Sequence, residues 1–141
     1  MAPPMAASFL GRPAFTMDDL LSEMTWPPNR VEVGLVETAG GVCSPQVGDG
    51  DAVTMVRSLA PDVVLLTADA GLGAINSVRL SMQALSGGCN YSTEIVVILN
   101  RYSESNELHG LNRLWLAEND GLRVLSMPSD ASELRALVSH N

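Results

Sequence analysis

The segment VEVGLVETAGG, residues 31–41, is the stretch around which the rest of the chain is organised. Its first six residues are mostly β-branched or apolar, which favours a β-strand. Glu37 follows directly, and Gly40 and Gly41 then provide a flexible turn. In open α/β sheets, ligands bind at the carboxyl ends of strands. The segment therefore predicts an α/β protein in which Glu37 stands at the edge of a phosphate or metal site.

The remainder of the chain repeats the order of strand, short loop and helix. Apolar runs at 63–68 and 95–99 suit strands buried on both faces of a parallel sheet, and residues 122–125 predict a last strand. Helices are expected over residues 5–10, from the Thr16 N-cap to the prolines at 27 and 28, and over 51–59, 74–85, 104–118 and about 130–138. This alternation predicts a parallel sheet of about four strands with flanking helices and right-handed crossovers. Residues 38–50 are expected to form a long functional loop.

Two further expectations concern side chains. The strand ends at Glu37, Asp69, Asn100 and Pro128 should open on the same side of the parallel sheet. The helix over 104–118 should bury one stripe of its surface, formed by Leu108, Leu111, Trp115 and Leu116.

Length and composition limit the classes of protein that fit. The chain has 141 residues, of which 46% are hydrophobic, so a single domain over residues 1–141 is expected. No apolar run reaches membrane-spanning length, and the N-terminus lacks a signal-peptide pattern, so a cytoplasmic location is expected. The net charge of −8 argues against a nucleic-acid partner. The two cysteines, Cys43 and Cys89, fit no metal spacing and no disulfide framework.

All eight basic residues are arginine, and the sequence contains no lysine. A Walker A loop needs a lysine that reaches the β- and γ-phosphates of the nucleotide. The chain therefore contains no Walker A motif, although a preference for arginine can also reflect codon usage.

Three groups of residues are candidates for binding. Glu37 could bind a metal or stand beside a phosphate, or it could be a solvated acid next to a tight turn. The segment from Gly71 to Asn76 leads into a helix N-terminus, where free N–H groups favour an anion, but it could equally be an ordinary strand-to-helix turn. Asn100 follows a strand directly, where a side-chain amide can recognise a purine edge, yet asparagine is also simply common after strands.

Several motifs, in this order, resemble the dethiobiotin synthetase family of biotin biosynthesis. Pro3–Ala7 with Gly11–Pro13 resembles the family's segment before its acidic strand, and Glu37–Gly41 resembles its Glu-Gly-Ala-Gly-Gly motif. Leu72–Asn76 resembles its Leu-Gly-x-Ile-Asn turn. Val97–Arg101 resembles the segment with its purine-side asparagine, and Met127-Pro128 resembles its adenine-side loop. The resemblance extends over nearly the whole chain. It implies a P-loop NTPase-like, doubly wound fold.

The resemblance also implies a reaction and a set of roles. In that family, 7,8-diaminopelargonate reacts with CO2 to a carbamate, ATP phosphorylates the carbamate, and ring closure to dethiobiotin releases phosphate. By resemblance Glu37 would ligate Mg2+, and Gly40 and Gly41 would lie near the substrate or phosphates. The turn formed by Gly73, Ala74, Ile75 and Asn76 would hold the substrate carboxylate across a homodimer interface. Asn100 and Pro128 would contact the adenine of ATP.

The chain departs from the family pattern in lacking the Walker A loop and the catalytic lysines, and Thr38 stands where a glycine is more common. It is expected to correspond to the middle and C-terminal part of a dethiobiotin synthetase, inactive without the phosphate loop. One alternative is a non-catalytic remnant that serves as a dimerisation or nucleotide-binding module. Another is a different member of the wider P-loop amidoligase or partitioning-ATPase group, which the Leu-Gly-x-Ile-Asn turn disfavours.

Overall fold

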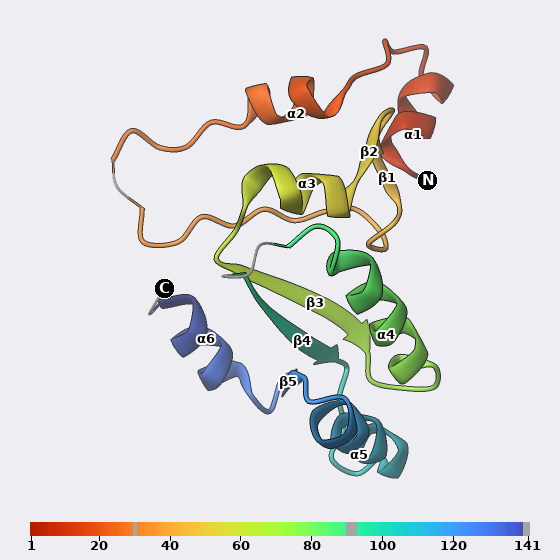
Figure 1. Ribbon diagram of the computed structural model, residues 1–141, viewed down its shortest axis with the longest axis vertical. Helices are drawn as coiled ribbons and strands as arrows, with labels where there is room; N and C mark the ends of the chain where they lie inside the picture. The colour runs from red at the N-terminus through yellow and green to blue at the C-terminus, as the bar shows by residue number, and fades with distance from the viewer. Residues whose placement is uncertain (30, 90–92, 140–141) are drawn as a thin grey trace. The chain divides into compact units, whose positions relative to one another are not determined.

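The computed structural model describes residues 1–29, 31–89 and 93–139 (Figure 1). The chain divides into two compact units, one formed by residues 1–60 with 84–90 and the other by residues 61–83 with 91–141. Each unit has a hydrophobic cluster of its own. The expectation of a single domain over 1–141 stays a prediction.

The first unit contains short helices and a small β-hairpin. Its elements are α1 (Pro3–Phe9), α2 (Met17–Glu23), β1 (Pro45–Val47), β2 (Gly50–Asp51) and α3 (Ala52–Leu59). The strands β1 and β2 pair antiparallel. The hairpin lies partly inside the long loop predicted for 38–50, so that prediction was wrong for residues 45–47 and 50.

The two predicted helix starts in this unit are confirmed. Thr16 caps α2, since its hydroxyl accepts a hydrogen bond from the N–H of Asp19 at 3.2 Å, and the Asp19 carboxylate accepts one from the N–H of Thr16 at 2.8 Å. These bonds to Thr16 hold the pKa of Asp19 below its usual value. Asp51 caps α3 by accepting from the N–H of Thr54 at 2.9 Å. Such caps satisfy N–H groups that have no partner inside the helix.

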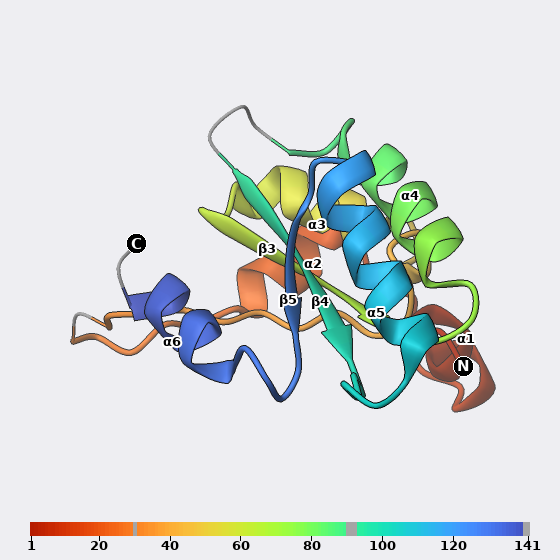
Figure 2. The same ribbon diagram turned by 90° about the horizontal axis from the view of Figure 1, so that it is seen from below.

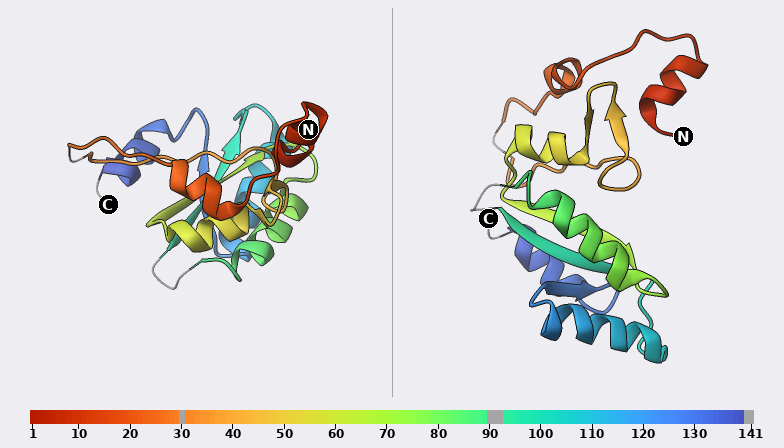
Figure 3. Two further views of the ribbon diagram at one scale, coloured as in Figure 1. Left: turned by 90° about the horizontal axis from the view of Figure 1, so that it is seen from above. Right: turned by 45° about the vertical axis from the view of Figure 1, so that its right-hand side comes forward.

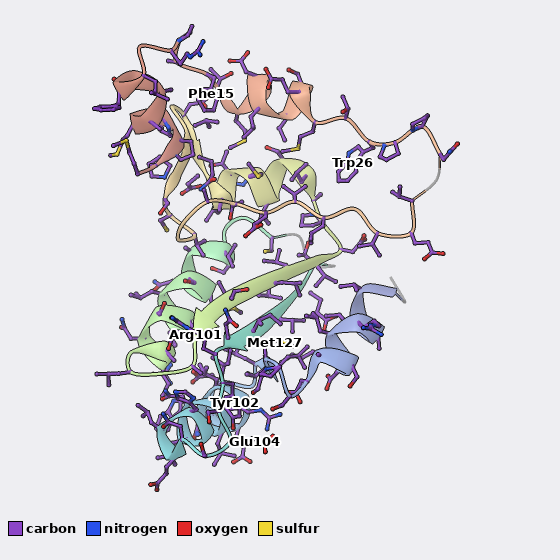
Figure 4. All side chains as sticks on the ribbon, turned by 180° about the vertical axis from the view of Figure 1, so that it is seen from behind. Phe15, Trp26, Arg101, Tyr102, Glu104 and Met127 are labelled. Atoms are coloured by element: carbon purple, nitrogen blue, oxygen red, sulfur yellow. The ribbon has the colours of Figure 1, made fainter. Side chains whose placement is uncertain are left out.

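The core of the first unit consists of Met17, Val47 and Met55, all buried. Partly buried apolar residues from α2 and its flanks pack against them, among them Phe15, which is labelled in Figure 4. The hairpin is tied to the start of α2, because the N–H of Met17 donates to the Asp49 carboxylate at 2.9 Å.

The strand predicted over residues 31–36 is not formed. This segment is irregular, and Val33 and Leu35 are 46% and 77% exposed. Within the described part of the chain no strand pairs with it, so its backbone gains no sheet hydrogen bonds. Apolar and β-branched content alone therefore did not make a strand, and Glu37 does not stand at a strand end.

The second unit is built on a parallel sheet of three strands rather than the four expected. They are β3 (Val63–Asp69), β4 (Glu94–Asn100) and β5 (Arg123–Ser126), in the spatial order β3-β4-β5. The register pairs Asp69 with Asn100 and Leu99 with Ser126. The fourth expected strand was the segment 31–36. The α/β class with a parallel sheet and flanking helices is confirmed.

The helices that accompany this sheet are α4 (Ala74–Leu85), α5 (Glu107–Leu114), a π-helix η1 (Trp115–Asn119) and α6 (Ala131–Ser139). The predicted bounds of α4 agree with the structure, and its last two residues are counted with the first unit. None of the helices in the described residues is long and apolar enough to cross a membrane.

The helices cover both faces of the sheet. Val96 and Ile98 pack with Leu137 of α6 on one face. Since side chains alternate along a strand, Val97 and Leu99 point to the other face, where α4 and α5 lie (Figure 2).

The predicted burial of the strands is correct only for the central one. Residues 96–99 of β4 are buried, whereas in β3 only Leu66 is buried. The reason is position, because β3 is an edge strand and β4 lies between two neighbours (Figure 3).

The helix predicted over 104–118 begins later and carries a different buried face. Asn106 is its N-cap, and from Trp115 the helix continues as a π-helix. Leu111 and Trp115, expected in the core, are 56% and 44% exposed, and Leu108 is 39% exposed. The buried residues are Asn112 and Leu116. A polar residue thus takes the central position of the buried stripe.

Candidate functional site

The carboxyl ends of the three parallel strands are joined by backbone hydrogen bonds. The N–H of Ala70 donates to Asn100 O at 3.1 Å, and the N–H of Met127 donates to Leu99 O at 2.9 Å. The N–H of Tyr102 then donates to Met127 O at 3.1 Å. Figure 4 shows Arg101, Tyr102 and Met127 around these strand ends. Asp69, Asn100 and Pro128 therefore open on one edge of the sheet, as the sequence predicted for these three residues.

Asp69 closes the turn that follows β3. One carboxylate oxygen accepts a hydrogen bond from the N–H of Gly71 at 2.8 Å, and the other forms an ion pair with Arg101. The bond from Gly71 is the main reason that the pKa of Asp69 lies below its usual value, and Arg101 lowers it further. The Arg101 backbone has φ of 55°, in the left-handed region that non-glycine residues seldom adopt. Both side chains are about half exposed or more, so we expect the ion pair itself to add little stability.

The turn leads directly into α4. Gly73 has φ of 89°, which a residue with a Cβ would adopt only with strain. The N–H of Ala74 donates to Gly71 O at 3.2 Å. The N–H groups of Ile75 and Asn76 lie in the first turn of α4, where no earlier helical carbonyl is available to them. The predicted substrate turn Gly73–Asn76 thus forms the N-terminus of a twelve-residue helix.

Asn112 is a residue of this site that the sequence reading missed. It is only 6% exposed, and its side-chain amide donates to Ala70 O at 2.9 Å and to Gly71 O at 2.8 Å. A signal was present in the sequence, because Asn112 lies four residues from both Leu108 and Leu116, on one helical face. Buried asparagines normally satisfy their hydrogen-bonding groups, so this position indicated a polar contact.

His109 lies on the same side of α5 as the loop after β4. Its Nδ1 accepts a hydrogen bond from the N–H of Ser103 at 3.1 Å, and its ring centroid lies 5.9 Å from that of Tyr102. The sequence reading gave His109 no role. The structure makes it a support of the loop that begins at Asn100.

Asn100 and Pro128, the predicted nucleotide contacts, are both exposed at the strand ends. The Asn100 side-chain oxygen accepts the N–H of Arg101 at 2.9 Å. Its amide N–H groups have no partner in the described part of the chain. These donors are therefore available to a ligand, and the nucleotide role of both residues stays a prediction.

Glu37, Gly40 and Gly41 belong to the first unit. Glu37 is exposed and has no ion pair or hydrogen bond with any described residue. Gly40 has φ of 85°, and the N–H of Gly41 donates to the Ser44 hydroxyl at 3.1 Å. That N–H group is consequently occupied within the loop rather than free for a phosphate.

No cluster of three or more His, Cys, Asp or Glu residues that could hold a metal occurs in the described ranges. Mg2+ is usually bound by one or two carboxylates together with phosphate oxygens and water. Glu37 could supply one such carboxylate ligand. The role of Glu37 as a metal ligand stays a prediction.

Comparison with known proteins identifies a set of related sequences. The chain is 27% identical over 138 residues to the ATP-dependent dethiobiotin synthetase BioD of Clostridium botulinum strain Loch Maree, covering 96% of this chain and 60% of that protein. It is 30% identical over 99 residues to the enzyme of the same name from Brachyspira hyodysenteriae, covering 68% of this chain and 44% of the relative. A third relative of that name, from Corynebacterium efficiens, is 36% identical over 84 residues, covering 60% of this chain and 38% of that relative.

No protein-family model matches the sequence, and no solved structure matches it significantly. The chain spans about 60% of the length of the first curated relatives it matches. The resemblance predicted from the motifs is confirmed as distant homology over nearly the whole chain.

Proposed function

Because this chain is a distant homologue of ATP-dependent dethiobiotin synthetases, we propose that it is a dethiobiotin synthetase-like protein that keeps the substrate-side and purine-side contacts of that reaction. The observation that carries the proposal is the edge of the sheet in the second unit. There the Leu-Gly-x-Ile-Asn turn opens α4, and Ala70 just before it is hydrogen-bonded to Asn100.

The proposed reaction couples 7,8-diaminopelargonate, CO2 and ATP. An amine of the substrate adds to CO2 and loses a proton to give a carbamate, and the γ-phosphoryl group of ATP passes to the carbamate oxygen, releasing ADP. The second amine attacks the carbamate carbon, and phosphate leaves as the ring of dethiobiotin closes. Mg2+, when bound with ATP, would neutralise phosphate charge.

The chain's own residues would bind and orient these molecules. The helix N-terminus at Gly73–Asn76 would hold the substrate carboxylate with N–H groups and the helix dipole. The amide of Asn100 and the ring of Pro128 would contact adenine. In the first unit, Glu37 would offer one carboxylate to Mg2+, and Gly40 and Gly41 would border the substrate or phosphates.

We propose that the chain alone does not turn over. Its sequence has no lysine and no Walker A loop, the two features that hold and neutralise the phosphates in P-loop enzymes. The three-stranded sheet would then be part of a doubly wound, P-loop NTPase-like domain. We also propose that the protein is cytoplasmic and forms a homodimer. Exposed apolar residues of α5, among them Leu111 and Leu114, form a surface that a second copy could bury.

The test combines a binding and a turnover measurement on the purified chain. Backbone amide NMR signals are followed during separate titrations with 7,8-diaminopelargonate and with Mg-ATP. The proposal expects shifts at Gly73–Asn76 with the first ligand and near Asn100 with the second. Incubation with both ligands and bicarbonate should give no dethiobiotin and no phosphate above background.

The outcomes separate the candidate functions. Shifts near Asn100 without shifts at Gly73–Asn76 would favour the alternative of a nucleotide-binding interaction module, whose non-catalytic role agrees with the missing phosphate loop. Dethiobiotin formation by the chain alone would overturn the proposed inactivity. The lack of any shift with either ligand would refute both the dethiobiotin synthetase-like function and the nucleotide-binding module.

A further inference from the structure

The hydrogen bonds of Asn112 hold the turn between β3 and α4, together with the bonds from Gly71 to Asp69 and from Ala74 to Gly71. Its amide nitrogen donates to two consecutive carbonyls, those of Ala70 and Gly71. The residue is buried, so loss of these bonds would leave polar groups unpaired away from water. The contact joins α5, which follows β4, to the turn that follows β3.

Planarity of the peptide bond transmits this constraint to the N–H groups. In a trans peptide the carbonyl and the following N–H point in opposite directions, and the only cis peptide bond in the described residues is Met127-Pro128. With Ala70 O turned toward Asn112, the N–H of Gly71 points away and meets the Asp69 carboxylate. With Gly71 O turned the same way, the N–H of Leu72 must also point away from Asn112.

The N–H of Leu72 has no hydrogen-bond partner in the described part of the chain, and the residue is 94% exposed. It immediately precedes Gly73 and the first turn of α4, where further N–H groups lack helical partners. The orientation of this donor follows from the two bonds that Gly71 O accepts, at 2.8 Å from the Asn112 side chain and at 3.2 Å from the N–H of Ala74.

We propose that Asn112 is a positioning residue for carboxylate binding at the start of α4. By holding the carbonyls of Ala70 and Gly71, it turns the N–H of Leu72 outward, so that this donor joins those of α4 in facing the carboxylate of 7,8-diaminopelargonate. The inference rests on the proposed function and adds a residue outside the Leu-Gly-x-Ile-Asn segment. Asn112 itself does not touch the substrate.

The experiment compares three variants by amide NMR during titration with 7,8-diaminopelargonate. Asn112→Asp replaces the donor nitrogen by an oxygen of similar size, and Asn112→Ala removes the bonds without burying a charge. Asn119→Asp, at an exposed position of η1, is the matched control for the chemical change. Binding is measured well below the melting temperature of each variant.

We expect both Asn112 variants to bind 7,8-diaminopelargonate at least about tenfold more weakly than the wild type, because a donor displaced from its binding geometry loses much of its contribution. The amide signals of Gly71, Leu72 and Gly73 should shift in the free variants as well. The control should keep the wild-type affinity. A purely structural role predicts lower melting temperatures with unchanged affinity, and that result would overturn the proposal.

Measurements on the wild type keep the test valid if the Asn112 variants do not fold. The side-chain amide protons of Asn112 should exchange slowly with solvent and shift on titration, whereas those of Asn119 should do neither. Fast exchange at Asn112, or no shift while the Gly73–Asn76 amides respond, would contradict the proposal. If the wild type shows no response to the ligand at all, the proposed function itself fails, which is distinguishable from a failure of Asn112 alone.

Discussion

The side chain of Gln46 forms a two-bond ring with the backbone of Ala39. The N–H of Ala39 donates to Gln46 Oε1 at 3.0 Å, and Gln46 Nε2 donates to Ala39 O at 2.8 Å. The same nitrogen also donates to Ser44 O at 3.1 Å. Gln46 is 5% exposed and so holds the Glu37–Gly41 loop through a buried polar contact.

Replacing Gln46 by alanine should loosen this loop. The substitution removes three hydrogen bonds around a partly buried backbone, so we expect a loss of about 1–3 kcal/mol in the free energy of unfolding. The amide of Ala39 should exchange with solvent much faster, which hydrogen-exchange mass spectrometry or NMR would measure. The comparison variant is Ser44→Ala, which removes only the bond from Gly41 and should leave the Ala39 amide protected. Equal protection of Ala39 in Gln46→Ala and wild type would contradict this assignment.

The buried stripe of the helix after β4 predicts a sharp difference between neighbouring leucines. Leu116 is fully buried, so Leu116→Ala should cost about 2–5 kcal/mol of stability through lost burial and a cavity. Leu114 is 50% exposed in the single chain, and Leu114→Ala should change the stability of the monomer, measured at protein concentrations that keep it monomeric, by no more than about 0.5 kcal/mol. Chemical denaturation of the two variants measures both values. Similar losses in the two variants would show that this helix has a different buried face.

Acid should weaken the turn after β3 through Asp69. The pKa of Asp69 in the folded protein is depressed, chiefly by the N–H of Gly71. The ionised carboxylate therefore stabilises the folded protein fully above the pKa of the unfolded chain, about 3.9. This stabilisation is lost as the pH falls from that value through the lower pKa of the folded protein. The wild type should therefore lose melting temperature relative to Asp69→Asn over that acidic interval. Arg101→Gln should keep most of this pH dependence, because the ion pair is the smaller cause. Complete loss of the pH dependence in Arg101→Gln would reverse that ranking.

Arg79 links α4 to the end of η1 through geometry that lysine cannot reproduce. Its guanidinium donates to both carboxylate oxygens of Asp120, at 2.9 and 2.6 Å, and lies 5.8 Å from the Trp115 ring centroid. We expect Arg79→Lys to lower the melting temperature and to change Trp115 fluorescence, since a lysine is a point charge without a planar fork. A Trp26→Phe background isolates the Trp115 signal. An unchanged emission spectrum together with an unchanged melting temperature would refute a stabilising role for the contact.

Local sequence patterns were sufficient to predict an element correctly where that element is stabilised by its own residues or by a contiguous apolar run. Thr16 and Asp51 were identified as helix caps because a cap needs only the side chain and the next few backbone groups. The strand β4 was identified because its residues are apolar on both faces, as a central parallel strand requires. The order of strands and helices over residues 51–138 followed from the same signals.

Three errors arose where a neighbour distant in sequence decides the outcome. Residues 31–36 have strand-like composition, but a strand needs a paired edge, and none is present in the described chain. The run 63–68 looked fully buried, but its place at the sheet edge leaves only Leu66 buried. The stripe through Leu111 and Trp115 was shifted because Asn112 turns inward to reach the carbonyls of another loop.

The sequence by itself determined the α/β class, the helix caps, the lack of a phosphate-binding lysine and the candidate residues of the Leu-Gly-x-Ile-Asn turn and Asn100. Each of these depends on residue identity or on contacts within a few positions. The sequence also predicted that Asp69, Asn100 and Pro128 share one sheet edge, whereas the tertiary structure alone decided which hydrogen bonds join these strand ends and that Asn112 holds the turn before α4. Those relationships join residues far apart in the chain, and only the register of the parallel strands brings them within hydrogen-bonding distance.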